Sequence, residues 1–354
     1  MTVQINQFKT KTVLVFCPNW VGDVVMSTPT LNCIHQNLPD ARIIGLIRNY
    51  ARGVIEDGPW FDEILEINDK TTGGIIDLAL QLRRLKPDLA LILPNSFRSA
   101  LIARLGGARR IFGYRRNGRT ALLNGGPQPL RNGNRITPRP MVEYYMELCR
   151  WLNFDTPPEL KPSLFYSDAN SAKGARFIES YGISPDDMLI GMNPGARFGS
   201  SKCWPVEHFA RLAELIEQRW TCKIMLFTGP GEQALGDQIV KLSKAKIIHP
   251  GPDNINLELL KLMVQRCRLL ITNDTGPRHY AVAFDIPVVV LMGPTDSRYT
   301  DANLEKTIIL RRDLECLPCH HKKCPLHHDC MAQILPQEVM EAGEKLLQEQ
   351  NKMS

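Results

Sequence analysis

The sequence lacks any apolar stretch long enough to cross a membrane. Its longest apolar runs, such as residues 286–292, fall far short of the ~20 residues that a membrane-spanning helix needs. Residues 1–9 contain neither an apolar core region nor a small-residue cleavage site, so they do not resemble a secretory signal. We therefore expect a cytoplasmic protein, in which any contact with a membrane is peripheral.

Two common nucleotide-binding signatures are also missing. The sequence contains no Gly-Lys-Ser or Gly-Lys-Thr, which argues against a P-loop nucleoside triphosphatase. The first strand-to-helix turn, residues 17–23, lacks the Gly-x-Gly-x-x-Gly pattern, which argues against a standard dinucleotide-binding dehydrogenase.

Acidic residues are absent from one long segment. Between Leu89 and Val142 there is no Asp, Glu or Lys, and the whole chain has a net charge of +6. The basic residues of this segment are Arg98, Arg104, Arg109, Arg110, Arg115, Arg116, Arg119, Arg131, Arg135 and Arg139. Because arginine binds carboxylates and phosphates with a planar fork, the segment suggests a polyanionic partner. Nucleic acid, an anionic lipid and an acidic sugar all fit, and so does a basic face exposed to solvent.

The length of 354 residues suits two domains better than one hydrophobic core. Short β-branched runs, such as residues 12–17, alternate with helical patterns in both halves, which predicts an α/β fold with parallel sheets. We place two Rossmann-like domains at 1–160 and 161–335, followed by a helix within 336–354. Two such domains in tandem are expected to face a central cleft, and ligands of open α/β sheets bind beyond the carboxyl ends of the strands.

The first strand-to-helix turn holds a candidate catalytic residue. Asp23 follows Gly22 at the start of a predicted helix. Asp is a favoured helix N-cap, and capping alone would account for it. Because the carboxylate also follows the carboxyl end of a strand, it is placed to accept a proton from a sugar hydroxyl.

A loop over residues 193–205 opens the second domain. It is rich in Gly and Ser, contains Arg197, Ser201 and Lys202, and leads into a helix. Backbone N–H groups, the helix dipole and Lys202 suit such a loop to phosphate binding. Whether Arg197 contacts phosphate or supports the loop stays open.

Two further turns in this domain begin helices. Asp274, Thr275 and Gly276 follow a strand, and the N–H groups of Thr275 and Gly276 are expected to face an anion, although Asp274 also suits a plain helix cap. Glu232 opens another helix and either binds a ribose or complements the helix dipole. Two phosphate-type loops in one domain favour a nucleoside diphosphate as ligand.

The C-terminal region concentrates Cys and His. Cys316, Cys319, Cys324 and Cys330 lie there together with four histidines, and Cys-x-x-Cys is typical of metal ligands. The spacing departs from that of a two-pair zinc ribbon. Structural zinc or iron, free thiols and a disulfide all remain open.

Together these motifs resemble the ADP-heptose:lipopolysaccharide heptosyltransferases of glycosyltransferase family 9. The resemblance covers nearly the whole chain and rests on residues 19–29, 193–205 and 274–279, in that order. The Cys/His tail, 318–331, looks most like that of the heptosyltransferase II branch. The resemblance implies a GT-B fold, with the acceptor bound by the N-terminal domain and ADP-heptose by the C-terminal one.

The resemblance also implies a reaction and its residues. L-glycero-D-manno-heptose would pass with inversion from ADP-heptose to heptosyl-Kdo2-lipid A during synthesis of the lipopolysaccharide inner core, with no required metal. Asp23 would be the base, and the last helix would pack back on the N-terminal domain. The expected donor-binding residues are Arg197, Ser201, Lys202, Glu232, Asp274, Thr275 and Gly276.

The acceptor's Kdo carboxylates and lipid A phosphates fit the acid-free segment, so we expect acceptor contacts from Arg98, Arg115, Arg116 and Arg119. The enzyme would associate peripherally with the inner face of the inner membrane and would bind no nucleic acid. Heptosyltransferase I or III on the same fold is the nearest alternative. A second alternative is a protein that binds nucleic acid through the arginine segment, but this segment lacks the interleaved aromatic residues expected for base stacking. A metal-binding module centred on residues 316–330 is a third possibility.

Overall fold

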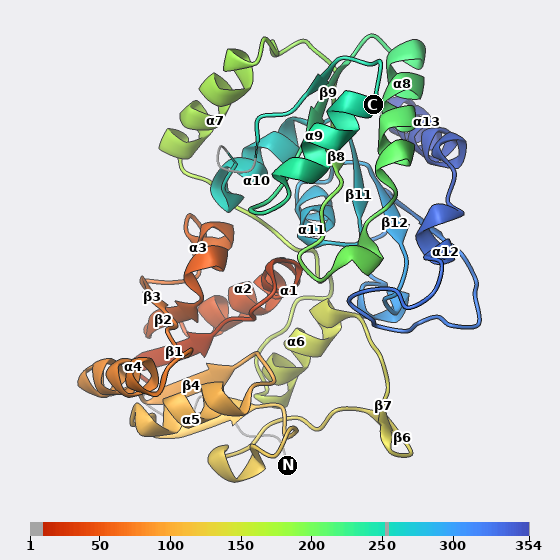
Figure 1. Cartoon of the computed structure of the whole chain (residues 1–354). Coiled ribbons are helices and arrows are strands. Elements are labelled where there is room, and N and C mark those ends of the chain that lie inside the picture. Colours follow the sequence, from red (N-terminus) through yellow and green to blue (C-terminus); the bar gives the residue numbers. More distant parts are fainter. Residues whose placement is uncertain (1–9, 252–254, 354) are drawn as a thin grey trace. The chain divides into compact units, whose positions relative to one another are not determined.

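The computed structural model describes residues 10–251 and 255–353 (Figure 1). The chain divides into two compact units. Unit 1 comprises the residues up to Phe165 together with Arg298–Thr300, and unit 2 comprises Tyr166–Ser297 and Asp301–Ser354. In the described residues, none of the helices is both long and apolar enough to cross a membrane.

Unit 1 contains a five-stranded parallel sheet in the order β3-β2-β1-β4-β5. Its strands are β1 (Thr12–Phe16), β2 (Arg42–Ile47), β3 (Glu63–Glu66), β4 (Leu89–Ile92) and β5 (Arg110–Gly113). The register pairs Val13 with Ile43 on one side and with Leu89 on the other. Strands β1, β2, β4 and β5 are buried and uncharged at their centres because helices cover both faces of the sheet, whereas the edge strand β3 is partly exposed.

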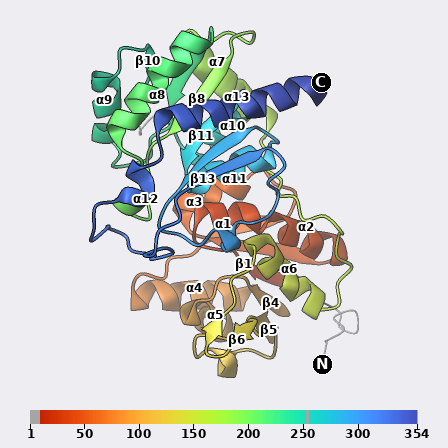
Figure 2. The same cartoon turned by 90° about the vertical axis from the view of Figure 1, so that its right-hand side faces the viewer.

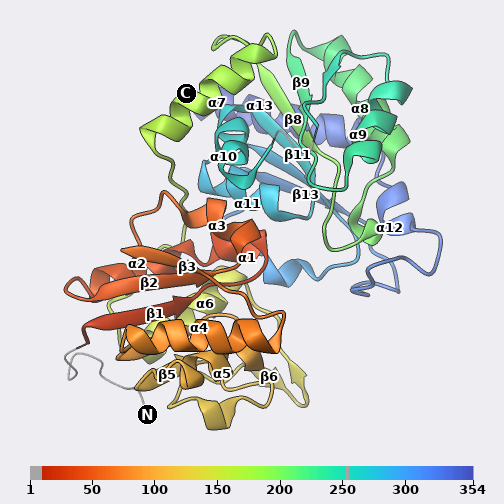
Figure 3. The same cartoon turned by 60° about the vertical axis from the view of Figure 1, so that its left-hand side comes forward.

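The helices of unit 1 form two layers. They are α1 (Val21–Met26), α2 (Thr28–Asn37), α3 (Asn49–Ile55), α4 (Thr72–Arg84), α5 (Phe97–Leu105) and α6 (Met141–Trp151). Side chains of α4 and α5, such as Leu82 and Ile102, share one core with alternate strand residues, such as Leu14 and Ile44. Helices α2 and α6 pack together on the opposite face (Figure 3).

The sequence predicts one helix over residues 22–36, but the structure has two. The helix breaks at Ser27, where the hydroxyl groups of Ser27 and Thr28 donate to the carbonyls of Val24 and Val25, each at 2.8 Å. Pro29 then occupies the first turn of α2, where a missing N–H costs nothing. The break keeps α1 as a short helix directly after β1.

Unit 2 contains a six-stranded parallel sheet in the order β10-β9-β8-β11-β12-β13. Its strands are β8 (Leu189–Asn193), β9 (Lys223–Leu226), β10 (Ile247–Ile248), β11 (Leu269–Asn273), β12 (Val288–Met292) and β13 (Thr307–Arg311). Its helices are α7 (Asp168–Ser180), α8 (Val206–Arg219), α9 (Gln233–Leu242), α10 (Leu257–Arg266), α11 (Gly276–Ala283), α12 (Asp329–Ala332) and α13 (Pro336–Met353). The predicted α/β fold with parallel sheets is therefore confirmed.

Short elements complete the chain. They are the hairpin strands β6 (Arg131–Asn132) and β7 (Arg135–Ile136) and the 3-10 helices η2 (Thr120–Leu122), η3 (Ser200–Lys202) and η5 (Ser297–Tyr299).

The last helix is part of the core of unit 2. Helix α13 packs beside α8 and against the strands of unit 2 (Figure 2). Its side chains Val339, Met340 and Leu346 belong to the same core as Phe209 of α8 and Ile271 of β11. Within unit 2 its apolar stripe is buried against the second sheet, and the expectation that this helix also packs on the N-terminal domain stays a prediction.

Candidate functional site

Each sheet has a switch point, where the strand order reverses and the loops of two neighbouring strands diverge. In unit 1 the switch lies between β1 and β4, and in unit 2 it lies between β8 and β11. Ligands of open α/β sheets bind beyond the carboxyl ends of the strands at such points. The predicted site residues follow these four strands or their neighbours.

Asp23 lies in the first turn of α1, directly after β1. The N-cap position of this helix is Trp20, so the alternative that Asp23 serves as the helix N-cap is wrong. Its carboxylate is partly exposed and lies near Tyr145 of α6. Burial raises the pKa of Tyr145 well above its usual range, and the negative charge of Asp23 adds to this effect.

A polar network crosses the carboxyl edge of the unit 1 sheet. Arg48, which follows β2, donates to Asn19 Oδ1 at 2.9 Å and pairs with the nearly buried carboxylate of Asp69 at 2.7 Å. Arg98, at the start of α5, donates to the Asp69 carbonyl at 2.8 Å and lies 3.8 Å from its carboxylate. Arg98 therefore reaches the predicted edge, but Asp69 offsets part of its charge.

A second network joins the loops after β4 and β5 to α6. The Tyr144 hydroxyl donates to Asn95 Oδ1 at 2.8 Å, and Arg116 lies within 3.5 Å of the same hydroxyl. Asn117 donates to the Asn95 carbonyl at 2.8 Å. Arg116 is partly exposed, and its neighbour Arg115 is exposed. Both keep surface available to a ligand at this edge.

The structure contradicts the prediction that Arg119 contacts the acceptor. Its side chain is fully buried, and its guanidinium donates to the carbonyls of Tyr114, Pro94 and Ser96. Burial lowers the pKa of Arg119 to about 10. A charge counted from the sequence does not reveal burial, and Arg119 in fact fixes the two loops that carry Asn95 and Arg116.

Exposed aromatic side chains at this edge escaped the sequence reasoning. Trp20, Tyr50 and Phe97 are all exposed. Tyr50 donates to the carbonyl of Asn19, and Phe97 directly precedes Arg98. An exposed aromatic residue in a loop beside a candidate base is a usable signal, because sugars present apolar faces to such rings.

In unit 2, Lys202 and Asp274 form one ion pair from two loops. Lys202 Nζ lies 2.8 Å from Asp274 Oδ2 and 2.7 Å from the Asp274 carbonyl. The other carboxylate oxygen accepts from Arg278 at 2.7 Å, and Thr295 donates to Asp274 Oδ2 at 2.7 Å. Burial alone would raise the pKa of Asp274, but Lys202 and Arg278 outweigh it and hold the pKa well below its usual range.

Two buried asparagines tie these loops together. Asn193, which ends β8, donates to the hydroxyl groups of Thr272 and Thr275, each at 3.1 Å. Asn273, which ends β11, donates to the Pro194 carbonyl at 2.6 Å. The loop motifs predict no role for these asparagines. Their position, one at the end of each strand flanking the switch point, was the available signal.

Thr275 is the N-cap of α11, and Gly276 is its first residue. The Thr275 side chain makes no cap hydrogen bond to the helix. The positive end of the helix dipole therefore lies beside Lys202, as an anion site requires. His279 is buried one turn further along; burial lowers its pKa to about 3, and the positive charge of Arg278 adds to this effect.

Glu232 is folded against the loop after β8. Its Oε2 accepts from the Gly229 N–H at 2.7 Å. A Cβ added at Gly195 would lie 1.9 Å from the same oxygen, so Gly195 allows the carboxylate to approach the backbone. Glu232 thus lies in the same loop cluster as Asn193 and Pro194.

The Cys/His tail braces the loop that carries Lys202. Ser201 is buried, and its hydroxyl donates to the His321 carbonyl at 2.5 Å, while His328 Nε2 lies 2.8 Å from the Ser201 carbonyl. Gly199 approaches Lys322 so closely that a Cβ there would lie 2.2 Å from its carbonyl oxygen. The Ser201 side chain therefore binds the Cys/His tail. This differs from the prediction that Ser201 contacts the nucleotide-sugar donor. Arg197 is exposed in the same loop.

The four tail cysteines lie near one another, because Cys316, Cys319 and Cys324 are close enough for their charges to add to the effect of burial on the pKa of Cys330. Over residues 10–251 and 255–353, no three Cys, His, Asp or Glu side chains are placed to hold a metal ion. Burial raises the pKa of Cys330 to about 11, and all ten cysteines are free thiols. Of the alternatives left open, the structure has the cysteines as free thiols.

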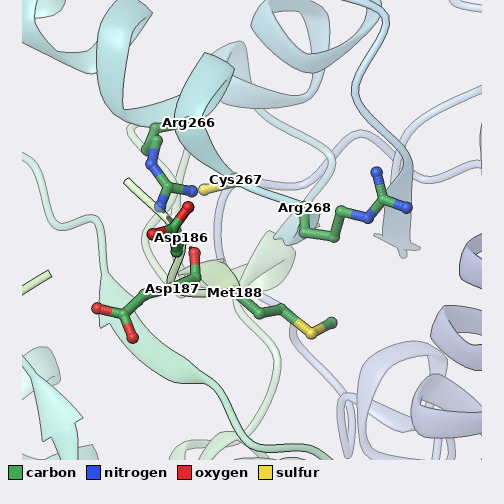
Figure 4. A pocket seen from close by; sticks show the side chains of 6 residues that line it. All are labelled: Asp186, Asp187, Met188, Arg266, Cys267 and Arg268. Carbon is green, nitrogen blue, oxygen red and sulfur yellow. Dashed lines mark hydrogen bonds between the residues drawn. The ribbon is translucent and has the colours of Figure 1, made fainter. Parts of the chain in front are cut away.

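A cavity of about 300 Å³ lies at the opposite end of the unit 2 sheet (Figure 4). It is lined by the residues that precede β8 and β11, namely Asp186, Asp187, Met188, Arg266, Cys267 and Arg268. Arg266 donates to the carbonyls of Ser184, Pro185 and Asp187 at 2.7–2.8 Å, so its guanidinium serves to close this turn. The cavity is separate from the loops that hold Lys202 and Asp274.

Two Rossmann-like units in tandem make up the GT-B architecture, which solved heptosyltransferase structures share with this chain. The family model described as glycosyltransferase family 9 (heptosyltransferase) matches residues 75–329. This chain belongs to that family and is a glycosyltransferase.

Relatives cover nearly the whole chain. Lipooligosaccharide heptosyltransferase 2 of Haemophilus influenzae is 30% identical over 315 residues, which are 84% of this chain and 88% of that protein. Lipopolysaccharide heptosyltransferase 2 of Escherichia coli is 27% identical over 360 residues, which are 95% of this chain and 98% of that protein. The solved structure of E. coli ADP-heptose lps heptosyltransferase II matches with a TM-score of 0.80 and 26% identity, covering 96% of this chain and 99% of that one.

Proposed function

We propose that this enzyme transfers L-glycero-D-manno-heptose from ADP-heptose to heptosyl-Kdo2-lipid A, with inversion at the anomeric carbon. The Lys202–Asp274 pair at the unit 2 switch point carries the proposal, because it holds a cation ready beside a helix N-terminus. Relatives named lipooligosaccharide or lipopolysaccharide heptosyltransferase 2, and a solved structure named ADP-heptose lps heptosyltransferase II, support transfer of heptose from ADP-heptose to a lipopolysaccharide.

The donor diphosphate binds between Lys202 and the first turn of α11. Asp274 holds the Lys202 ammonium in place before the ligand arrives, so little ordering remains to be done on binding. The N–H groups at Thr275 and Gly276 face the β-phosphate, and Glu232 accepts from the ribose hydroxyls. When the sugar leaves, negative charge grows on ADP, and these fixed donors stabilise it.

Asp23 acts as the base in a single displacement. The acceptor hydroxyl oxygen forms a bond to the anomeric carbon as Asp23 takes the hydroxyl proton. The bond between the anomeric carbon and the β-phosphate oxygen breaks, and ADP leaves with the electron pair. The transition state has oxocarbenium character, as in glycoside chemistry.

The acceptor binds at the carboxyl edge of unit 1. Arg115, Arg116 and Arg98 supply positive charge for Kdo carboxylates and lipid phosphates. Trp20 and Phe97 offer exposed aromatic surface to the sugar rings. Because this acceptor is anchored in a bilayer, the enzyme works while associated peripherally with the inner face of the inner membrane.

Replacement of Asp23 by Asn tests the chemical step. We expect ADP release to fall by at least about 100-fold, the usual contribution of a positioned base, while the calorimetric affinity for ADP stays unchanged. Asp40→Asn, an exposed carboxylate in the same unit, is the matched control and should leave both quantities unaltered. An Asp23→Asn enzyme with wild-type turnover would remove Asp23 from the mechanism.

A further inference from the structure

Helix α4 exposes two large apolar side chains to solvent. Ile76 and Leu80, one turn apart, have relative exposures of 51% and 50%. Leu78 and Leu82 of the same helix are buried in the core of the unit 1 sheet. The outer side of α4 is therefore apolar at its centre.

A third exposed apolar side chain lies beside the end of this helix. Leu105, the last residue of α5, is 40% exposed, and its carbonyl accepts from Arg83 Nε at 2.8 Å. Helices α4 and α5 pack side by side, as Figure 3 shows. Ile76, Leu80 and Leu105 thus belong to one surface, which we call the α4–α5 face.

The charges on the α4–α5 face are mostly positive. Arg83, Arg84 and Arg104 are exposed, and none of them forms an ion pair within the described parts of the chain. Lys86 is exposed just beyond α4, and Asp77 is the carboxylate carried by α4 itself. Basic side chains around exposed apolar ones are typical of a surface that lies in the interface of an anionic bilayer.

Unit 2 has an exposed apolar pair in a different electrostatic setting. Val240 and Leu242 of α9 are 37% and 47% exposed. Carboxylates of Glu214 and Glu217 accept from the backbone N–H groups of Lys244 and Lys246 just after this helix, and Asp237 is exposed on α9. Lys241, Lys244 and Lys246 are also exposed there, so charges of both signs surround this patch. It lacks the positive excess of the α4–α5 face and therefore provides a matched control.

We propose that the α4–α5 face docks on the anionic lipid leaflet in which the acceptor is embedded. Ile76, Leu80 and Leu105 enter the headgroup region, while Arg83, Arg84 and Arg104 pair with lipid phosphates. The inference rests on the proposed lipid-anchored acceptor. Helix α5 supports it, because the same helix ends in this face at Leu105 and begins at the acceptor edge with Phe97 and Arg98.

Vesicle flotation with the full chain tests the docking. We expect the wild-type protein to float with vesicles of phosphatidylethanolamine and phosphatidylglycerol, and far less with vesicles of phosphatidylcholine. Ile76→Ser/Leu80→Ser and Arg83→Gln/Arg84→Gln/Arg104→Gln should each reduce the bound fraction at least fivefold. Val240→Ser/Leu242→Ser should bind as the wild type does.

Transferase assays separate docking from catalysis. With the acceptor embedded in anionic vesicles, Ile76→Ser/Leu80→Ser should raise the apparent KM at least fivefold. With a water-soluble acceptor from which the acyl chains have been removed, its rate should equal that of the wild type, which also shows that the variant is folded. Wild-type vesicle binding by this variant would overturn the proposal. The proposal would also fail if the substitutions abolished self-association of the protein and left lipid binding unchanged. Absence of transfer to both acceptors by the wild-type enzyme would instead refute the proposed function.

Discussion

Substitution of Gly195 by Ala gives a sharp test of the donor site. The added Cβ would lie 1.9 Å from Glu232 Oε2 and 2.0 Å from its Cδ, well below the 3.0 Å that real Cβ contacts respect. The carboxylate must therefore swing away, because it is the mobile end of a side chain and the backbone is not. Its hydrogen bond from Gly229, now 2.7 Å long, is lost in the process.

The expected effect falls on binding more than on stability. A hydrogen bond to a charged group contributes about 1.5–3 kcal/mol, so displacement of Glu232 from the proposed ribose contact should weaken ADP binding about 10- to 100-fold. Glu232→Gln should cause a loss of similar size. Because both changes remove the same contact, the double variant should be no weaker than the worse single one.

Calorimetry with ADP measures these affinities, and thermal unfolding controls for the fold. Gly229→Ala is the matched control, since its Cβ would lie 3.4 Å from Glu232 Oε2, an ordinary contact distance. Unchanged ADP affinity in Gly195→Ala, or losses that add in the double variant, would refute the assignment of Glu232 to the donor.

Three further predictions follow from buried contacts. His328→Ala should weaken ADP binding several-fold by loosening the Ser201 loop, whereas His328→Gln, which keeps a donor, and His327→Ala, an exposed neighbour, should bind normally; equal losses in both alanine variants would contradict the brace. His279 keeps a pKa of about 3 in the folded state, so the unfolded chain alone takes up a proton below pH 6.5, and stability from this group is present above pH 6.5 and is lost as the pH falls. Denaturant titrations between pH 6.5 and 4 should show a loss of about 1.4 kcal/mol per pH unit that His279→Gln lacks, and identical slopes would refute it. Arg119→Met leaves three carbonyls without their donor and should lower the free energy of unfolding by about 3 kcal/mol; a loss below about 1 kcal/mol would show that these hydrogen bonds matter little.

Much of the fold follows from local sequence signals. Runs such as 12–17 and 188–192 predict β1 and β8 because buried parallel strands are continuous and apolar. Helix α5 and strand β5 were not predicted, since both lie in the acid-free segment, where arginines obscure the apolar pattern. The position of α13 depends on which sheet buries its apolar stripe, and a helical pattern alone does not specify that.

In the candidate sites, too, local sequence predicts some features, whereas others depend on tertiary packing. Loop composition predicted an anion site around Lys202, Thr275 and Gly276, because glycine and helix starts have a direct physical meaning. The ion pair of Lys202 with Asp274 joins residues 72 positions apart, and its partner Arg278 was not given a role. Arg119 was misassigned because burial of a charge depends on tertiary packing.

The most direct test of the proposed reaction is ADP release from ADP-heptose with two acceptors assayed separately, heptosyl-Kdo2-lipid A and Kdo2-lipid A. We predict release with the heptosylated acceptor and none above background with the shorter one. Release only with Kdo2-lipid A would keep the family and the fold but contradict the proposed acceptor, and release with neither would contradict the proposed donor.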